Sequence, residues 1–437
     1  MTGRYKAYPE YKDSGVEWLE AVPMHWSSKP LKFMCTCNDE VINESADADY
    51  EIEYVDISSV SAVQGISKTE KVMFGKSPSR ARRIVRDGDV IVSTVRTYLE
   101  AIAPIINPPQ NMIVSTGFAV IRPNQYLDKG FASYCLRAKG FIREVVARSV
   151  GVSYPAINAS DLVEIKVPSL PKSEQQKIAN FLDHETAKID TLIAKQEKLI
   201  ELLKEKRQAV ISHAVTKGLN PDVQMKDSGV EWLGEVPAHW EVLPTKRFFR
   251  LVAEPSTKNH GKELLSVYAA IGVAPRKDLE QKGNKASNTD GYWSVKKGDI
   301  IVNKLLAWMG AVGYSDYDGV TSPAYDILRK TKDINPKFYH FLFRQEFTQS
   351  EFKRWSRGIM EMRLRLYFEE LGRIMMPVPP KNEQDKIVAE IESMNATFVK
   401  IEDKATKQIE LMKERKTALI SAAVTGKIDV RDWQESA

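Results

Sequence analysis

A segment of sixteen residues occurs twice in this chain. Residues 11–26 read YKDSGVEWLEAVPMHW and residues 225–240 read MKDSGVEWLGEVPAHW, with twelve identical positions and an offset of 214 residues. Repeat periods of about 20–50 residues are typical of solenoids and propellers, and this period is far longer. The repeat therefore predicts two copies of a whole domain within the 437 residues.

Two further pairs of segments continue the duplication. The segment at 86–103 matches the one at 296–313, and each has a Gly-Asp turn followed by an alternating β-branched run, which predicts a strand in both copies. Later in each copy, prolines lead into a helical pattern, at 167–183 and at 376–392. The stretches between these segments share little sequence, so we expect a common frame that carries different inserts.

Each copy ends in a long helical pattern, over 185–217 and again over 396–425, with Lys and Glu on the polar faces. A narrow apolar stripe on so long a helix needs a partner surface, and we expect the two helices to pair antiparallel. The alternative is that each helix lies on its own domain. The residues predicted to form an interface, between the helices or with a partner, are Ile189, Leu192, Leu199, Leu203, Val210, Ile401, Ile409, Met412 and Leu419.

The sequence contains no persuasive enzymatic site. NPPQ at 107–110 is close to the Asn-Pro-Pro-aromatic loop of amino-methyltransferases, but Gln110 replaces the base-stacking aromatic residue, so we interpret the segment as a turn. The six histidines lack metal-ligand spacing, the three cysteines are too few for a disulfide framework, and no P-loop occurs. We therefore predict no catalytic residue, no metal and no cofactor in this chain.

Basic residues gather in one short stretch of each copy. The 63 Lys and Arg against 58 Asp and Glu give a net charge of +5, a weak indication of an anionic partner. Arginine clusters can clamp phosphates and read guanine edges. A solvent-exposed basic loop is the alternative for either stretch alone, and the occurrence in both copies favours DNA. The predicted DNA-binding residues are Lys76, Arg80, Arg82, Arg83, Arg86, Lys353, Arg354, Arg357, Arg363 and Arg365.

The composition is that of a globular protein with two or three domains. Hydrophobic residues make up 43% of the chain, and no run of 18 apolar residues occurs that could cross a membrane. The first residues lack the apolar core of a signal peptide. We expect a cytoplasmic protein with no membrane segment.

Taken in order, these motifs resemble the specificity subunits of type I restriction-modification enzymes. The resemblance covers nearly the whole chain. It rests on DSGVEWLGEVPAHW, the GDVIV and GDIIV strands, GVSYPAINASDLVEIKVPSLPKSEQQKIANFLD, the helix KIDTLIAKQEKLIELLKEKRQAVISHAVTKG and the second-copy variant GIMEMRLRLYFEELGRIMMPVPPKNEQDKIV.

This resemblance implies an α/β (α+β) fold with a pseudo-two-fold internal repeat, in which two globular target recognition domains are separated by a pair of long antiparallel helices. The implied recognition domains are residues 1–170 and 219–379, and the implied spacer-helix regions are 171–218 and 380–437.

The resemblance also implies a non-catalytic DNA specificity subunit. Each recognition domain would read one half of a bipartite site in double-stranded DNA, and the helices would dock two methyltransferase (modification) subunits. S-adenosylmethionine would bind to those partners, and cleavage would belong to separate restriction subunits. Two alternatives stay open: a stand-alone DNA methyltransferase with its own target domain, and a coiled-coil adaptor that binds no nucleic acid.

Overall fold

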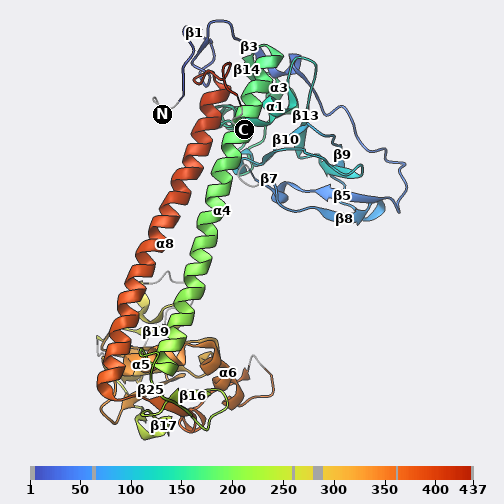
Figure 1. The fold of residues 1–437 in the computed structure, drawn as a ribbon. Coiled ribbons are helices and arrows are strands. Elements are labelled where there is room, and N and C mark those ends of the chain that lie inside the picture. Colours follow the sequence, from blue (N-terminus) through green and yellow to red (C-terminus); the bar gives the residue numbers. More distant parts are fainter. Residues whose placement is uncertain (1–4, 62–64, 258–260, 279–288, 361–362, 435–437) are drawn as a thin grey trace. The chain divides into compact units, whose positions relative to one another are not determined.

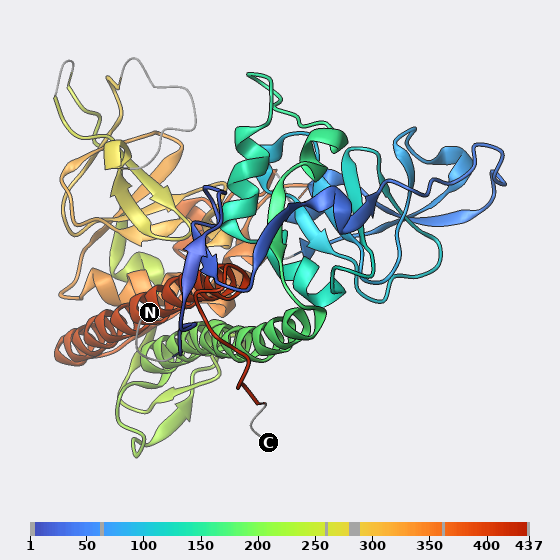
Figure 2. The same ribbon diagram turned by 90° about the horizontal axis from the view of Figure 1, so that it is seen from above.

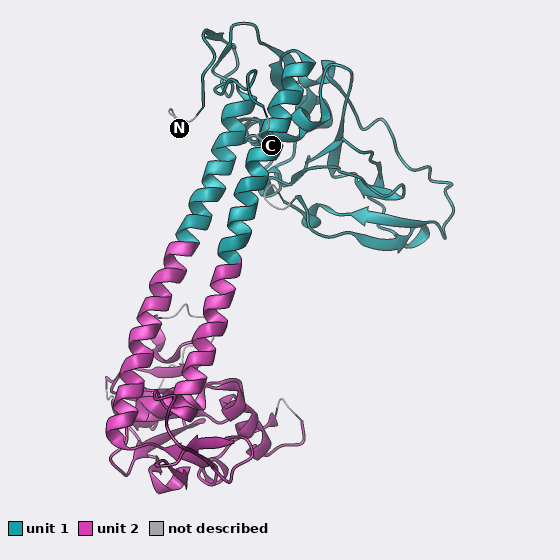
Figure 3. Cartoon of the chain, viewed as in Figure 1, with its two compact units in different colours: residues 1–197, 406–437 teal, residues 198–405 magenta. Residues whose placement is uncertain are grey.

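The computed structural model describes residues 5–61, 65–257, 261–278, 289–360 and 363–434. These residues form two compact units, residues 1–197 with 406–437 and residues 198–405 (Figure 3). The two longest helices, α4 (Lys172–Lys217) and α8 (Lys381–Val424), each contribute residues to both units. This division differs from the four predicted regions, which stay a prediction and whose outer ends include the undescribed residues 1–4 and 435–437.

The globular part of the first unit is an α+β domain in which short strands precede three short helices (Figure 1). Its elements are β1 (Tyr11–Asp13), β2 (Ala21–Pro23), β3 (Ser27–Pro30), β4 (Cys35–Cys37), β5 (Glu51–Val55), β6 (Val60–Ser61), β7 (Gly65–Ile66), β8 (Glu70–Met73), β9 (Ala81–Ile84), β10 (Val90–Ser93), β11 (Ile102–Pro104), β12 (Met112–Ser115), β13 (Phe118–Pro123), α1 (Lys129–Cys135), α2 (Lys139–Ala147), α3 (Ala159–Val163) and β14 (Lys166–Ser169).

The globular part of the second unit follows the same order of strands and helices. Its elements are β15 (Met225–Asp227), β16 (Glu235–Pro237), β17 (Glu241–Pro244), β18 (Phe249–Val252), β19 (Leu265–Tyr268), β20 (Gly272–Pro275), β21 (Trp293–Val295), β22 (Ile300–Asn303), β23 (Val312–Tyr314), β24 (Gly319–Thr321), β25 (Tyr325–Lys330), α5 (Pro336–Phe343), α6 (Glu346–Trp355), α7 (Phe368–Leu371) and β26 (Met375–Val378).

An antiparallel four-stranded sheet lies at the centre of both units. Its strand order is β11-β10-β13-β4 in the first unit and β23-β22-β25-β18 in the second. The middle strands β10 and β22 are buried along their whole length, because they are rich in Val and Ile and are covered on both faces. The strand predicted in each copy by the Gly-Asp turn and its β-branched run is therefore confirmed.

A second set of strands also corresponds between the units. In the first unit, β12 pairs in parallel with β5 and antiparallel with β9. In the second unit, β24 pairs antiparallel with β21 and forms a parallel bridge to Leu264, the residue before β19. The stretches 27–85 and 241–295 share little sequence, yet their described residues form equivalent strands.

A buried ion pair joins the Gly-Asp turn to the central sheet in each unit. Arg122 on β13 donates through two guanidinium nitrogens to Asp89, at 3.0 and 2.9 Å, and Arg329 on β25 does the same to Asp299, at 2.8 Å for both bonds. Only 1% of Asp89 and 2% of Asp299 is exposed. The hydrogen bonds to the carboxylate raise the pKa of Arg122 above its ordinary value.

Helices α4 and α8 lie side by side within each unit (Figures 1 and 2). In the first unit, Lys416 of α8 forms an ion pair with Asp190 of α4 at 2.7 Å. In the second unit, Arg207 of α4 donates a hydrogen bond to Asn395 of α8 at 2.8 Å. A later residue of α4 thus meets an earlier residue of α8, which confirms the predicted antiparallel pairing.

Both helices begin within the segments where prolines lead into a predicted helical pattern, at Lys172 and Lys381. These starts lie about four turns before the predicted long patterns at 185–217 and 396–425. Their first turns pack on the globular part of the same unit, since Ile178 and Phe181 of α4 and Ile387 and Ile391 of α8 are buried in the two main cores. Both interpretations of the long helices therefore hold in part. The first turns of each helix pack on a globular domain, and turns further along the helix pack against the other long helix.

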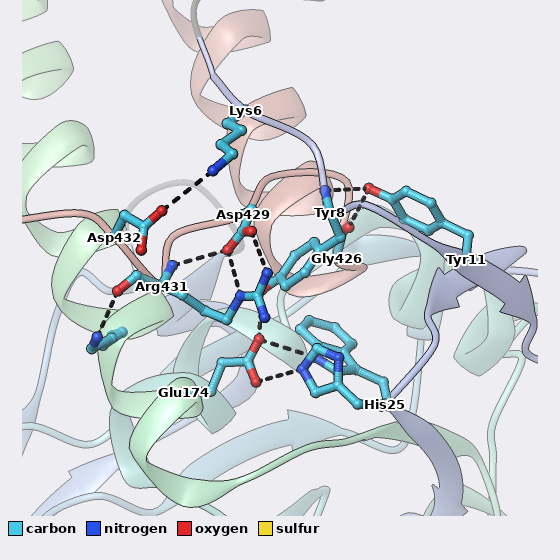
Figure 4. A network of polar contacts seen from close by, with 11 residues as sticks. Lys6, Tyr8, Tyr11, His25, Glu174, Gly426, Asp429, Arg431 and Asp432 are labelled. Carbon is cyan, nitrogen blue, oxygen red and sulfur yellow. Dashed lines mark hydrogen bonds and ion pairs between the residues drawn. The ribbon is translucent and has the colours of Figure 1, made fainter.

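The N-terminal and C-terminal segments meet at the start of α4 in the first unit (Figure 4). Buried Glu174 accepts hydrogen bonds from the Tyr8 hydroxyl at 2.6 Å and the Trp26 indole at 3.1 Å, and it contacts His25 at 2.9 Å. Burial and the Glu174 carboxylate raise the pKa of Tyr8, so this hydroxyl stays a donor. Trp26 is fully buried and packs the opening motif into the core of the first unit.

The C-terminal segment completes this network. The Gly426 carbonyl accepts a hydrogen bond from the Tyr11 hydroxyl at 3.1 Å, and the Asp429 amide donates to the Lys6 carbonyl at 2.8 Å. Arg431 is hydrogen-bonded to Asp429 and lies over the ring of Tyr8. Residues far apart in the sequence are thereby held together around the start of α4.

Asp299→Ala removes one partner of a buried ion pair and leaves the Arg329 guanidinium without its main acceptor. We expect the free energy of unfolding of the full chain to fall by about 3 kcal/mol, because a buried charge loses its compensation. Urea unfolding followed by circular dichroism measures this change. The exposed Asp333→Ala is the matched control, and equal stability of the two variants would contradict the structural role of the pair.

Candidate nucleic-acid interface

The residues that suggested enzymatic chemistry have structural partners. His25 and His239 contact Glu174 and Glu383, and burial lowers the pKa of His340 to about 3, so this side chain stays neutral. His260 lies outside the described residues. Among the residues that the structure describes, no group of three or more His, Cys, Asp or Glu side chains could hold a metal ion.

The NPPQ segment is a turn, as interpreted from the sequence. Asn107 has a φ of 46°, its amide donates to Asp87 at 3.0 Å, and the Met112 amide donates to the Pro109 carbonyl at 3.0 Å. Its conformation is therefore set by a hydrogen bond to the Asp87 carboxylate and by a backbone hydrogen bond within the turn. None of the helices in the described part of the chain has both the length and the apolar surface that a membrane-spanning helix requires.

Three of the five predicted basic residues of the first unit already have partners within the chain. Arg82 stacks on the ring of Phe74, and Arg86 forms an ion pair with Glu40. Arg83 donates a hydrogen bond to the Thr116 carbonyl at 3.5 Å, and its burial lowers its guanidinium pKa below the ordinary value. Lys76 and Arg80 are exposed. A phosphate contact would therefore fall first to Lys76 and Arg80, at one end of the stretch.

The predicted basic residues of the second unit surround the loop after α6. Arg354 pairs with Glu351 at 2.7 Å, and Arg357 pairs with the buried Glu370. The Lys353 ammonium lies 5.1 Å from the centre of the Trp308 ring. The guanidinium groups of Arg363 and Arg365 are exposed and have no acidic partner within the described part of the chain. Of the predicted DNA-binding residues in the second unit, these two arginines are therefore the strongest candidates for a phosphate contact.

The two basic stretches occupy different places in the repeated frame. The stretch at 353–365 covers the end of α6 and the loop after it, whereas 76–86 covers β9 and its flanks. The counterpart of the α6 loop in the first unit follows α2 and contains Arg148, with Arg96 stacked on Tyr154 beside it. Sequence reasoning missed Arg96 and Arg148 because they are isolated along the chain, although aligning α2 with α6 could have found them.

The predicted interface residues of the helices divide into two groups. Ile189, Leu203, Ile409 and Leu419 are buried, and Val210 and Met412 are partly buried. The exposed members are Leu192, Leu199 and Ile401. The buried group belongs to the packing of the chain itself. The exposed group is free to bind a partner, and its interface role stays a prediction.

These features define a duplicated recognition protein: two copies of one α+β frame, each with a long helix, exposed basic loops and different inserts. The model of the type I restriction modification DNA specificity domain matches residues 33–202 and 258–411, more than half of the chain. The chain therefore belongs to the family of type I restriction-modification specificity subunits. The predicted family, fold class and function as a non-catalytic DNA specificity subunit are confirmed.

Similar proteins agree with this family. A specificity subunit attributed to the type I restriction enzyme MjaX of Methanocaldococcus jannaschii is 23% identical over 96% of this chain and 98% of that protein. The EcoDI specificity subunit of Escherichia coli is 25% identical over 68% of this chain and 69% of that protein. The crystal structure of the HsdS subunit from Thermoanaerobacter tengcongensis has a TM-score of 0.56 at 20% identity and covers 93% of this chain and 98% of its own; this likeness shows the fold.

Replacing Arg363 and Arg365 together with Ala should weaken DNA binding by the full chain. The salt slope of log K should fall by about one unit for each phosphate contact that the substitutions remove, because fewer counterions are released. Fluorescence anisotropy over a range of salt concentrations measures both quantities. Lys332→Ala, an exposed charge on the same unit, is the control. Unchanged affinity and slope in the double variant would show that the α6 loop is only a solvated basic loop.

Proposed function

We propose that this chain gives a type I restriction-modification complex its sequence specificity by reading a bipartite site in double-stranded DNA, one half with each unit. The observation that carries the proposal is that the two units repeat the same internal contacts but differ in their inserts. A common frame with different inserts suits two domains that do the same task on two different sequences.

The side chain of a repeated glutamine illustrates the common frame. Gln175 accepts a hydrogen bond from the amide of Asp128, the N-cap of α1, and Gln384 accepts one from the amide of Asn335, the N-cap of α5, both at 2.8 Å. Each glutamine also donates to carbonyls just before its own helix. The frame thus positions the first short helix of each unit from the start of a long helix.

A pair of equivalent arginines illustrates the different inserts. Arg344, at the end of α5, donates to several backbone carbonyls of its unit, including those of Tyr268 and Ala269 in the β19–β20 turn. Arg137, after α1, instead donates to the carbonyl and hydroxyl of Ser133, one turn earlier. The turns around the short helices are therefore held differently, which supports different base contacts by the two units.

We also propose that the helices dock two methyltransferase subunits, which carry S-adenosylmethionine and transfer its methyl group, with cleavage left to separate restriction subunits. The exposed apolar residues of α4 support this proposal: Leu199 and Leu202 lie on one face of the helix and are not covered within the chain. A complex of this kind acts on chromosomal DNA, which favours a cytoplasmic location.

Calorimetric titration tests this division of labour. The chain alone should give no binding heat with S-adenosylmethionine, whereas the chain assembled with its methyltransferase partner should bind it. Leu199→Asp with Leu202→Asp should prevent co-purification of the partner, because charged side chains oppose burial of this face. Lys204→Asp, an exposed position on the same helix, is the control. Saturable binding of the cofactor to the chain alone would contradict the proposal.

A further inference from the structure

The loop that follows the second short helix of each unit has a fully exposed apolar residue at its tip. In the first unit this loop follows α2 and its tip is Val152, and in the second unit it follows α6 and its tip is Ile359. The exposed fractions are 103% and 102%, so neither side chain is covered by its own chain. Exposed β-branched residues at matching places in both copies point to a shared binding partner.

The two ends of each loop are joined by backbone pairing. Val150 pairs with Ala156 through two backbone hydrogen bonds of 2.8 and 3.0 Å, and Arg357 pairs with Arg365 through two of 2.9 Å. A glycine precedes each tip, with a φ of +119° at Gly151 and +152° at Gly358. At Gly358 an added Cβ would lie 2.6 Å from a backbone oxygen, so a larger residue would not fit.

A second turn braces the loop in each unit. In the first unit, the Thr97 hydroxyl donates to the Ser149 hydroxyl at 2.7 Å, and Arg96 lies over the ring of Tyr154 at 5.0 Å. In the second unit, the Leu366 amide donates to the Lys304 carbonyl at 2.9 Å. These contacts keep each tip projecting from a supported base, as a recognition side chain requires.

The surroundings of the tips are basic and partly aromatic. Exposed Tyr98 and Leu99 lie on the bracing turn of the first unit, and exposed Met309 lies at the same position in the second. The arginines that flank the tips are Arg96, Arg148, Arg363 and Arg365. Among these, Arg148 pairs with Glu144, and the other three have no acidic partner within the described part of the chain. A polyanion that also offers apolar groups fits this surface, and duplex DNA offers phosphates beside thymine methyls and base faces.

We propose that Val152 and Ile359 are specificity-determining residues that enter a groove of the DNA and contact bases, one tip in each half of the bipartite site. The flanking arginines hold the nearby phosphates and thereby fix the depth and register of the tip. This inference rests on the proposed function, since it assigns a role within the reading of two half-sites.

Val152→Ser and Ile359→Ser test the proposal in the full chain assembled with its methyltransferase partner. Each change removes an apolar side chain from a site that DNA covers, so affinity for the cognate duplex should fall on the order of tenfold. The salt slope should stay unchanged, because both variants keep the arginines that hold the phosphates. Mapping of adenine methylation should show relaxed sequence preference in one half-site for Val152→Ser and in the other for Ile359→Ser.

Ile106→Ser and Leu219→Ser, at other exposed apolar positions in the two units, are the matched controls and should behave as the unchanged chain. If the unchanged assembly binds DNA and both tip variants bind and methylate it equally well, the tip proposal is overturned and the proposed function stands. If the tip variants lose the methyltransferase partner and the remaining chain keeps its DNA affinity, the loops bind protein, which also overturns the proposal. If the unchanged assembly binds no DNA, the proposed function fails, and the tip proposal fails with it.

Discussion

The contact between the opening motif and the ends of the long helices organises each unit of this protein. In the first unit, Glu174 at the start of α4 binds His25 and Trp26, and Gly426 after the end of α8 packs against the ring of Trp26. In the second unit, Glu383 at the start of α8 contacts His239 of the repeated motif, and Gly218 after the end of α4 lies beside Trp240. The segment occurs twice because, in each unit, the start of one long helix and the end of the other pack against the buried tryptophan of this motif.

The same contact explains why the glycines after the helices are required. Gly218 and Gly426 have φ values of +77° and +75°, which terminate the helices in the left-handed region. An added Cβ at Gly426 would lie 2.3 Å from Pro23 of the opening motif, so the chain end approaches too closely for any side chain. The same glycine is thus needed both to end the helix and to let the chain pack closely on the opening motif.

The sequence predicted the parts of the fold whose pattern is long or repeated. The alternating runs gave the central strands β10 and β22, and the periodic stripes gave the antiparallel helices. It could not predict that the described residues of 27–85 and 241–295 form equivalent strands, because these strands are short and their pairing depends on distant partners. It did predict the helical pattern after the prolines at 167–183 and 376–392, but not that the buried residues of these first turns of α4 and α8 pack on a domain.

The candidate site was predicted less completely than the fold for a physical reason. Charge along the sequence reveals basic stretches, but it does not reveal that Glu40 pairs with Arg86 or that Glu370 pairs with Arg357. A search for clustered charge also overlooks an isolated arginine such as Arg96, although the fold places Arg96 beside an exposed loop. A helical stripe likewise gives the spacing of apolar residues and does not separate buried Ile189 from exposed Leu192.

We propose that one chain with two equivalent units directs methylation to a bipartite sequence. Genome-wide mapping of adenine methylation in cells that express the chain with its methyltransferase partner tests this claim most directly. We expect one motif with two defined halves and a fixed gap of unspecified bases, and loss of that methylation when the chain is absent. A single contiguous motif, or methylation that persists without the chain, would contradict it.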